Sequence, residues 1–238
     1  MAGDPNWSSV VLLCDFDGTN GATTTTDSSP LANTITRTTG TGCTLDTTQT
    51  KFGATSTLLP SIAGPRWNCA DSASWQFTGQ FTVECWIYPT TLRVAKIIGQ
   101  WAGGSKGWML GFSDATHAIF YYSLDGSTNP NLTGAWSPSL NAWHHFAVDR
   151  DGSNILRLYG DGVVLNSATV SGAFWDSTGG LQFCGDDGSL WAPIIGWCDE
   201  LRITKGVARY AGAFTPPTAA FPQGAFVSGA AAGFLFAA

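Results

Sequence analysis

The sequence is poor in charge, because Asp, Glu, Lys and Arg together make up 12% of its 238 residues. Only 11 residues are Lys or Arg, and the net charge is −6. Neutralising a nucleic-acid backbone requires clustered basic side chains, so this composition excludes a nucleic-acid partner. No apolar run approaches the roughly 20 residues of a membrane span. The start MAGDPNWSSVVLL lacks the basic residues of a secretory signal. We therefore expect a soluble protein without membrane insertion or a standard export signal.

The six cysteines lack the close pairing of a metal or redox motif, since no two of them have C-x-x-C spacing. Three of them lie inside the apolar runs VVLLCDF, FTVECWIYP and GWCDELRI, where a small thiol is an ordinary core side chain. We predict buried, reduced thiols. A disulfide framework is the alternative, because the number is even.

Helical periodicity is missing as well, because no stretch of 10 or more residues has apolar side chains recurring at the 3.6-residue period of an α-helix. Short runs of alternating apolar and polar residues, separated by Gly, Asn, Asp and Pro, recur throughout and predict an all-β sandwich of two antiparallel sheets. Alternation in 81–88 places Phe81, Val83, Cys85 and Ile87 toward the core. The predicted strands are 9–16, 34–38, 56–59, 81–88, 95–100, 107–113, 118–123, 143–150, 154–160, 163–169, 181–185 and 196–204.

Five segments, in this order, resemble the laminin-G-like, concanavalin A-like jelly rolls common in bacteriophage structural proteins. They are LLCDFDGTNG, KFGATS, FTVECWIYP, WHHFAVDRDGSNILRLYGDGV and DELRITKGVARYAGAFTPPTAAFP. The resemblance implies a jelly-roll sandwich with six or seven strands in each sheet and the N-terminal strand beside the DELRI strand. It implies no particular ligand, because many members bind glycans or proteins and others have no known ligand.

An enzyme with this fold would most readily be a glycoside hydrolase, which needs two carboxylates roughly 5 to 10 Å apart. The sequence holds only two glutamates, Glu84 and Glu200, and it lacks the Glu-x-Asp-x-x-Glu string of related hydrolases. Each glutamate is better explained as the partner of an arginine across the sheet. We therefore predict no catalytic residues.

Several acidic pairs could bind calcium, which takes oxygen ligands in flexible geometry. Asp15 with Asp17, and Asp149 with Asp151, also fit turns in which Asp bonds to its own backbone. Asp186 and Asp187 form the best acidic loop, and the alternative is a solvated turn. We predict no resident metal or cofactor and leave calcium open.

The 11 tryptophans are numerous, and aromatic faces are suited to gripping sugar rings. Trp175 and Trp191 flank Asp186 and Asp187 in the loop-rich stretch AFWDSTGGLQFCGDDGSLWAP. Aromatic side chains beside carboxylates match the composition of a glycan site. We predict these four residues as ligand-binding, and the alternative is that the tryptophans close an end of the sandwich.

Residues 1–222 form the predicted jelly-roll domain, and 223–238 form an uncharged apolar tail. Left in water, such a segment favours aggregation, so we expect it to dock on its own domain or, preferably, on a neighbouring subunit. The candidate assembly residues are Phe226, Phe234, Leu235 and Phe236.

Together these observations predict an oligomeric bacteriophage virion protein, a head decoration or tail accessory protein, made in the host cytoplasm. Its exposed jelly roll would adhere to host-surface or environmental glycans, and its partners would be other virion proteins. The alternatives are an architectural decoration protein without a ligand and, with less support, a glycan-cleaving enzyme.

Overall fold

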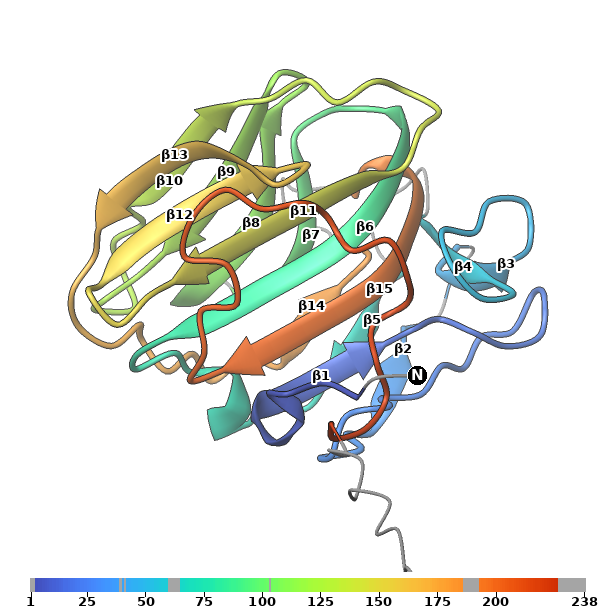
Figure 1. Ribbon diagram of the computed structural model, residues 1–238, viewed down its shortest axis with the longest axis horizontal. Helices are drawn as coiled ribbons and strands as arrows, with labels where there is room; N and C mark the ends of the chain where they lie inside the picture. The colour runs from blue at the N-terminus through green and yellow to red at the C-terminus, as the bar shows by residue number, and fades with distance from the viewer. Residues whose placement is uncertain are drawn as a thin grey trace, which may run out of the picture.

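The computed structural model describes residues 3–38, 40, 42–59, 65–102, 104–185 and 193–226. Over these ranges the chain forms 15 strands and two three-residue 3₁₀ helices, η1 (Trp7–Ser9) and η2 (Ala73–Trp75). The strands make two antiparallel sheets that face each other (Figure 1). The two-sheet jelly-roll sandwich is therefore confirmed. None of the helices in the described ranges is long and apolar enough to cross a membrane.

The first sheet has eight strands in the order β13-β12-β11-β6-β15-β4-β3, with β1 paired to β15. Its strands are β1 (Val10–Cys14), β3 (Thr44–Asp46), β4 (Ser56–Leu59), β6 (Phe81–Thr91), β11 (His144–Arg150), β12 (Ile155–Gly160), β13 (Val163–Thr169) and β15 (Ile195–Lys205). The second sheet has the order β10-β9-β8-β7-β14-β5-β2. Its strands are β2 (Ile35–Arg37), β5 (Trp67–Cys69), β7 (Ala95–Ala102), β8 (Ser105–Asp114), β9 (His117–Tyr122), β10 (Asn131–Ala135) and β14 (Leu181–Phe183).

All 12 predicted segments contain a strand, and the N-terminal strand lies beside the DELRI strand, with Leu13 opposite Arg202. Three further strands, β3, β5 and β10, were not predicted, because three to five residues are too few for their alternation to stand out from the surrounding loops. The expected six or seven strands per sheet is correct for the second sheet and one too few for the first.

The core lies between the sheets, and the alternation in β6 is confirmed. Phe81, Val83, Cys85 and Ile87 are all fully buried there. The facing sheet contributes a similar set of large side chains, among them Trp108, Leu110, Phe112 and Phe120. Each buried apolar side chain of this size contributes about 1.5–3 kcal/mol to the free energy of unfolding, so the apolar layer between the sheets supplies most of the stabilisation.

The six cysteines are all free and buried, which confirms the prediction of reduced thiols. Cys43 illustrates their environment, because its Sγ donates to the carbonyl oxygen of Cys184 at 2.7 Å. Burial raises the pKa of the Cys43 thiol to about 12. The Cys43 thiol is therefore neutral at physiological pH and acts as a small apolar group.

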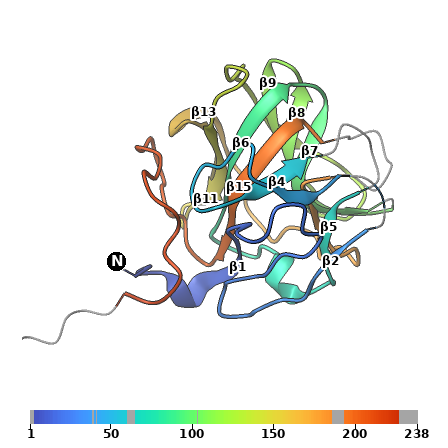
Figure 2. The same ribbon diagram turned by 90° about the vertical axis from the view of Figure 1, so that its right-hand side faces the viewer.

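The outer face of the first sheet is covered by residues 206–222, which we call the C-terminal strap. Figures 1 and 2 show it crossing the outside of this sheet, on the side away from β7, β8 and β9. Backbone N–H groups of the strap bind the sheet below, from Arg209 to Thr82 Oγ1 at 2.9 Å and from Ala211 to Asp149 Oδ2 at 2.7 Å. The outward-facing Thr82 and Glu84 of β6 are therefore buried as well.

The buried thiols lead to a chemical prediction. A thiol reagent such as DTNB should modify the native protein negligibly over minutes, because the thiolate is the reactive form and no thiol is exposed. After unfolding in guanidinium without reductant, all six cysteines should react. A lower count in the unfolded protein would reveal disulfides and contradict the structure.

Candidate functional site

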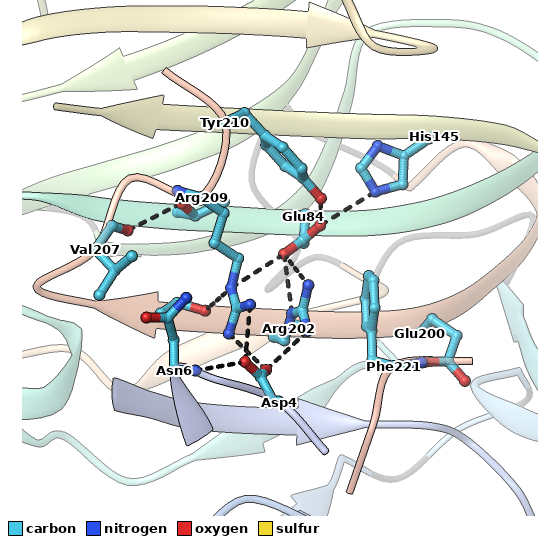
Figure 3. A network of polar contacts seen from close by, with 12 residues as sticks. Asp4, Asn6, Glu84, His145, Glu200, Arg202, Val207, Arg209, Tyr210 and Phe221 are labelled. Carbon is cyan, nitrogen blue, oxygen red and sulfur yellow. Dashed lines mark hydrogen bonds and ion pairs between the residues drawn. The ribbon is translucent and has the colours of Figure 1, made fainter. Parts of the chain in front are cut away.

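A cluster of charged side chains lies between the first sheet and the strap (Figure 3). At its centre is Glu84 of β6, which lies opposite Arg202 of β15 in the strand register. Glu84 Oε1 accepts hydrogen bonds from Arg202 Nε at 2.9 Å and Nη2 at 2.8 Å. On its other oxygen, Glu84 accepts a short hydrogen bond from Tyr210 of the strap, and His145 Nε2 lies 3.3 Å away. The expected pairing of Glu84 with arginine is confirmed.

Asp4 brings a second carboxylate into this cluster from the N-terminal segment. Its Oδ2 lies 3.1 Å from Arg202 Nη1 and 2.7 Å from Arg209 Nη2. The backbone of Asp4 also pairs with the segment after the strap, through Asp4 N to Gly224 O at 2.8 Å and Phe226 N to Asp4 O at 3.2 Å. Two carboxylates therefore balance two guanidinium groups, and both ends of the described chain are attached to the cluster.

The environment of Glu84 is unsuited to acid catalysis. Burial alone would raise its pKa, but Arg202, His145 and Arg209 outweigh burial and hold the pKa well below its ordinary value. The Glu84 side chain is fully buried. The pKa of the Tyr210 hydroxyl is raised by its own burial and by the negative charge of Glu84. Glu84 is therefore a permanent carboxylate with no access to solvent.

Glu200 does not pair with an arginine as expected; it accepts the backbone N–H of Phe221 at 2.7 Å. It lies at a bulge of β15 with a positive φ of 50°, which turns its side chain toward the strap. Burial raises the pKa of Glu200 to about 7, with a further contribution from Asp15, while the Phe221 N–H bond only partly offsets them. The Arg202 guanidinium instead lies 3.7 Å from the centroid of the Phe221 ring.

The acidic pairs considered for calcium are occupied by protein donors. Asp15 Oδ2 accepts hydrogen bonds from Ser28 Oγ at 3.0 Å and Gln223 Nε2 at 2.6 Å, and Asp17 Oδ1 accepts from Ala54 N at 2.6 Å. In the described part of the chain, no three or more His, Cys, Asp or Glu residues are arranged to hold a metal. The second pair is used in the same way, with Asp149 accepting from Tyr159 and Asp151 pairing with Arg157.

Trp175 is the predicted ligand-binding residue whose position can be evaluated, and it is 44% exposed. It borders a hollow of about 220 Å³ lined by Gln76, Leu124, Ala173, Phe174, Trp175 and Asp176. The other three predicted binding residues, Asp186, Asp187 and Trp191, lie outside the described residues, as do Phe234, Leu235 and Phe236. Their roles, including calcium binding at Asp186 and Asp187, stay predictions.

Sequence reasoning missed the residue that holds this hollow in place, Arg150. The guanidinium is fully buried and donates to the carbonyl oxygens of Gly79 at 2.7 and 2.9 Å and of Gly172 at 2.8 Å. It also lies 4.6 Å from the centroid of the Phe174 ring. Arg150 therefore joins the loop after η2 to the loop before β14. A signal was present, because alternation from Phe146 places Arg150 on the core face, where a cation needs partners.

The raised pKa of Glu200 predicts a pH dependence of stability. Its ordinary value is 4.5 and its folded value about 7, so the folded state keeps the proton to higher pH. The protonated Glu200 carboxyl contributes fully to the free energy of unfolding below pH 4.5. This contribution is lost as the pH rises toward 7 and amounts to roughly 3 kcal/mol at most. Glu200→Gln retains an acceptor for Phe221 but does not titrate. Denaturant titrations from pH 4 to 8 should therefore show a flatter profile for the variant.

The matched control is Asp176→Asn, which removes one exposed carboxylate and leaves Glu200 in place, so the slope due to Glu200 should persist in this variant. Asp199, whose burial raises its pKa to about 8, contributes a slope in the same direction. Because the neighbouring Glu200 charge adds to that rise, Glu200→Gln also reduces the Asp199 slope, so both effects flatten the profile of the variant. A Glu200→Gln profile parallel to that of the wild type would show that Glu200 does not titrate as described.

Comparison with solved structures identifies binding domains of similar fold. The binding domain of Paraclostridial Mosquitocidal Protein 1 matches with a TM-score of 0.64 at 15% identity, covering 88% of this chain and 50% of that one. The botulinum neurotoxin serotype D binding domain matches with a TM-score of 0.62 at 14% identity, covering 86% and 50%. The chain thus spans about half the length of these toxin domains.

A third structure matches over nearly its whole length. It is domain 4 of AbnA, an extracellular GH43 arabinanase from Geobacillus stearothermophilus, in complex with arabinotriose. The TM-score is 0.58 at 21% identity, covering 87% of this chain and 95% of that domain. No curated protein sequence matches the chain.

The family comparison covers more than half of the sequence. Residues 65–209 match the laminin-G-type model described as the concanavalin A-like lectin/glucanases superfamily. This range extends from β5 into the strap and includes Glu84, Arg150 and Trp175. The chain is therefore a laminin-G-like member of the concanavalin A-like lectin/glucanase superfamily.

Proposed function

We propose that this chain is a non-catalytic carbohydrate-binding jelly roll that serves as a bacteriophage virion protein. The observation that carries the binding role is the hollow at Trp175, which presents an exposed indole beside an amide and a carboxylate. That combination suits a sugar ring, which has apolar C–H groups and many hydroxyls. Glu84, the carboxylate at the centre of the charged cluster, is by contrast fully buried.

Similar folds support the same reading, since the arabinanase domain is in complex with arabinotriose and the toxin domains are binding domains. Cleavage of a glycan has less support. Both glutamates are at most 2% exposed, and each already accepts hydrogen bonds from the protein. An inverting or retaining hydrolase needs its two carboxyl groups to flank the substrate.

The virion role is supported by the segment 199–222, which resembles bacteriophage structural proteins and comprises the end of β15 and the strap. Phe226 directly follows the bridge between Asp4 and Ala225 and is 54% exposed. We propose that Phe226 and residues 227–238 dock on other virion proteins or on a second copy of the chain. The assembled protein would be located in the virion after synthesis in the host cytoplasm.

The carbohydrate-binding role is tested with a glycan array probed with the full-length protein. We expect binding to a defined group of glycans, because the Trp175 hollow is open in the folded domain. Bound glycans should remain intact, as measured by the release of reducing ends. A blank array, together with virions that lose stability without the protein, would favour the architectural alternative. Turnover that Glu84→Gln abolishes would establish an enzyme instead.

The docking role is tested by deleting residues 227–238. This deletion keeps the backbone bonds between Asp4 and residues 224–226. The variant should unfold at the wild-type temperature but should no longer be incorporated into particles, as measured by its amount in purified virions. A Gly/Ser segment of equal length in place of the tail controls for chain length. Normal incorporation of either variant would rule out docking through these residues.

A further inference from the structure

The hollow at Trp175 is built on a rigid frame. Beneath it, the buried ring of Phe174 stacks on the ring of Tyr122, with the two centroids 5.2 Å apart. The backbone N–H of Phe174 donates to Phe77 O at 2.9 Å. The backbone N–H of Trp175 donates to Ser123 O at 2.8 Å and fixes the residue in its loop. The Arg150 guanidinium joins the two loops on either side. A site held in this way loses little conformational freedom when a ligand binds.

The position of the indole depends on a turn in the loop after β9. The Asp125 carboxylate accepts hydrogen bonds from the backbone N–H groups of Ser127 at 2.9 Å and Thr128 at 2.8 Å. This turn places Gly126 at a φ of 79°, directly against the indole. A Cβ added at Gly126 would lie only 2.6 Å from Trp175 Cε2 and Nε1. Only glycine allows the indole to rest there.

The lining groups define the chemistry of a ligand. Trp175 and Leu124 are 44% and 46% exposed and offer an apolar surface, while Gln76 and Asp176 offer hydrogen-bonding groups at the same hollow. A carboxylate accepts hydrogen bonds from hydroxyl groups but repels anions. The net charge of −6 on the whole protein also disfavours anionic ligands. The site therefore favours neutral sugars over sialylated or uronic-acid sugars.

The size of the hollow limits the ligand further. Its volume is about 220 Å³, below the range of about 300–1,000 Å³ that holds a drug-sized molecule. We propose that the hollow is a subsite for one neutral sugar ring of a glycan, with the ring packed on the Trp175 indole and its hydroxyls bound by Asp176 and Gln76. This inference rests on the proposed carbohydrate-binding function and assigns its location.

The first test is binding of the neutral glycan that gives the strongest array signal, measured by isothermal titration calorimetry with full-length protein. Trp175→Ala should weaken binding at least tenfold, and Trp175→Phe should retain part of it because an aromatic surface remains. Asp176→Ala should weaken binding several-fold. The matched control is Leu140→Ala, another apolar side chain that is 49% exposed but lies outside the hollow. It should bind as the wild type does.

The second test separates positioning of the indole from its presence. Gly126→Ala keeps Trp175 but displaces the ring, so it should weaken binding several-fold while the thermal unfolding transition remains cooperative. Its control is Gly212→Ala in the strap, where a Cβ meets nothing within 4 Å and which lies outside the hollow. Wild-type affinity in Gly126→Ala would overturn the assigned position of the ring.

These outcomes distinguish the location of the site from the function. If the wild type binds glycans and Trp175→Ala binds them equally well, the subsite is elsewhere and the carbohydrate-binding function stands. If no glycan binds the wild type, the function itself is refuted. Stronger binding of sialylated than of neutral glycans would contradict the assigned ligand class.

Discussion

The buried ion pair between Glu84 and Arg202 is the interaction on which the outer half of this molecule depends. Removing two charges from water costs several kcal/mol per ion, and only close partners and saturated hydrogen bonds offset that cost. Here Tyr210, Arg209 and Asp4 complete the set, and they come from the strap and the N-terminal segment. The pair therefore specifies where those segments lie as well as how two neighbouring strands pair.

The strap crosses the outer face of the first sheet and accounts for the burial of the charged groups there, which stabilise the fold through their mutual contacts. The buried charge of Arg150 is stabilised in a different way. Its guanidinium donates to backbone carbonyl oxygens and lies against an aromatic ring. The result is a fixed pair of loops at the rim, where Trp175 is exposed.

Much of the fold was predictable because side chains in a strand alternate between faces and one face of each sheet must be apolar. That local rule identified twelve strands and the inward set around Phe81. It could not show that Glu84 on the opposite face is buried, because Tyr210 lies 126 residues further along the chain. Composition singled out Trp175, but its support by Gly126 and Arg150 arises from contacts between distant loops. Short strands such as β5 alternate over only three residues, which is too short a pattern to be recognised without the neighbouring strands with which they pair.

The bridge between Asp4 and Ala225 has a mechanical consequence. Because the two segments lie side by side, a pulling force applied through residues on either side of the bridge would act first on the hydrogen bonds Asp4–Gly224 and Asp4–Phe226. The ion pairs from Asp4 to Arg202 and Arg209 would be loaded next. The strands of the sandwich would bear tension only after these contacts had broken, so the rim with Trp175 would keep its shape while the base of the domain is under load.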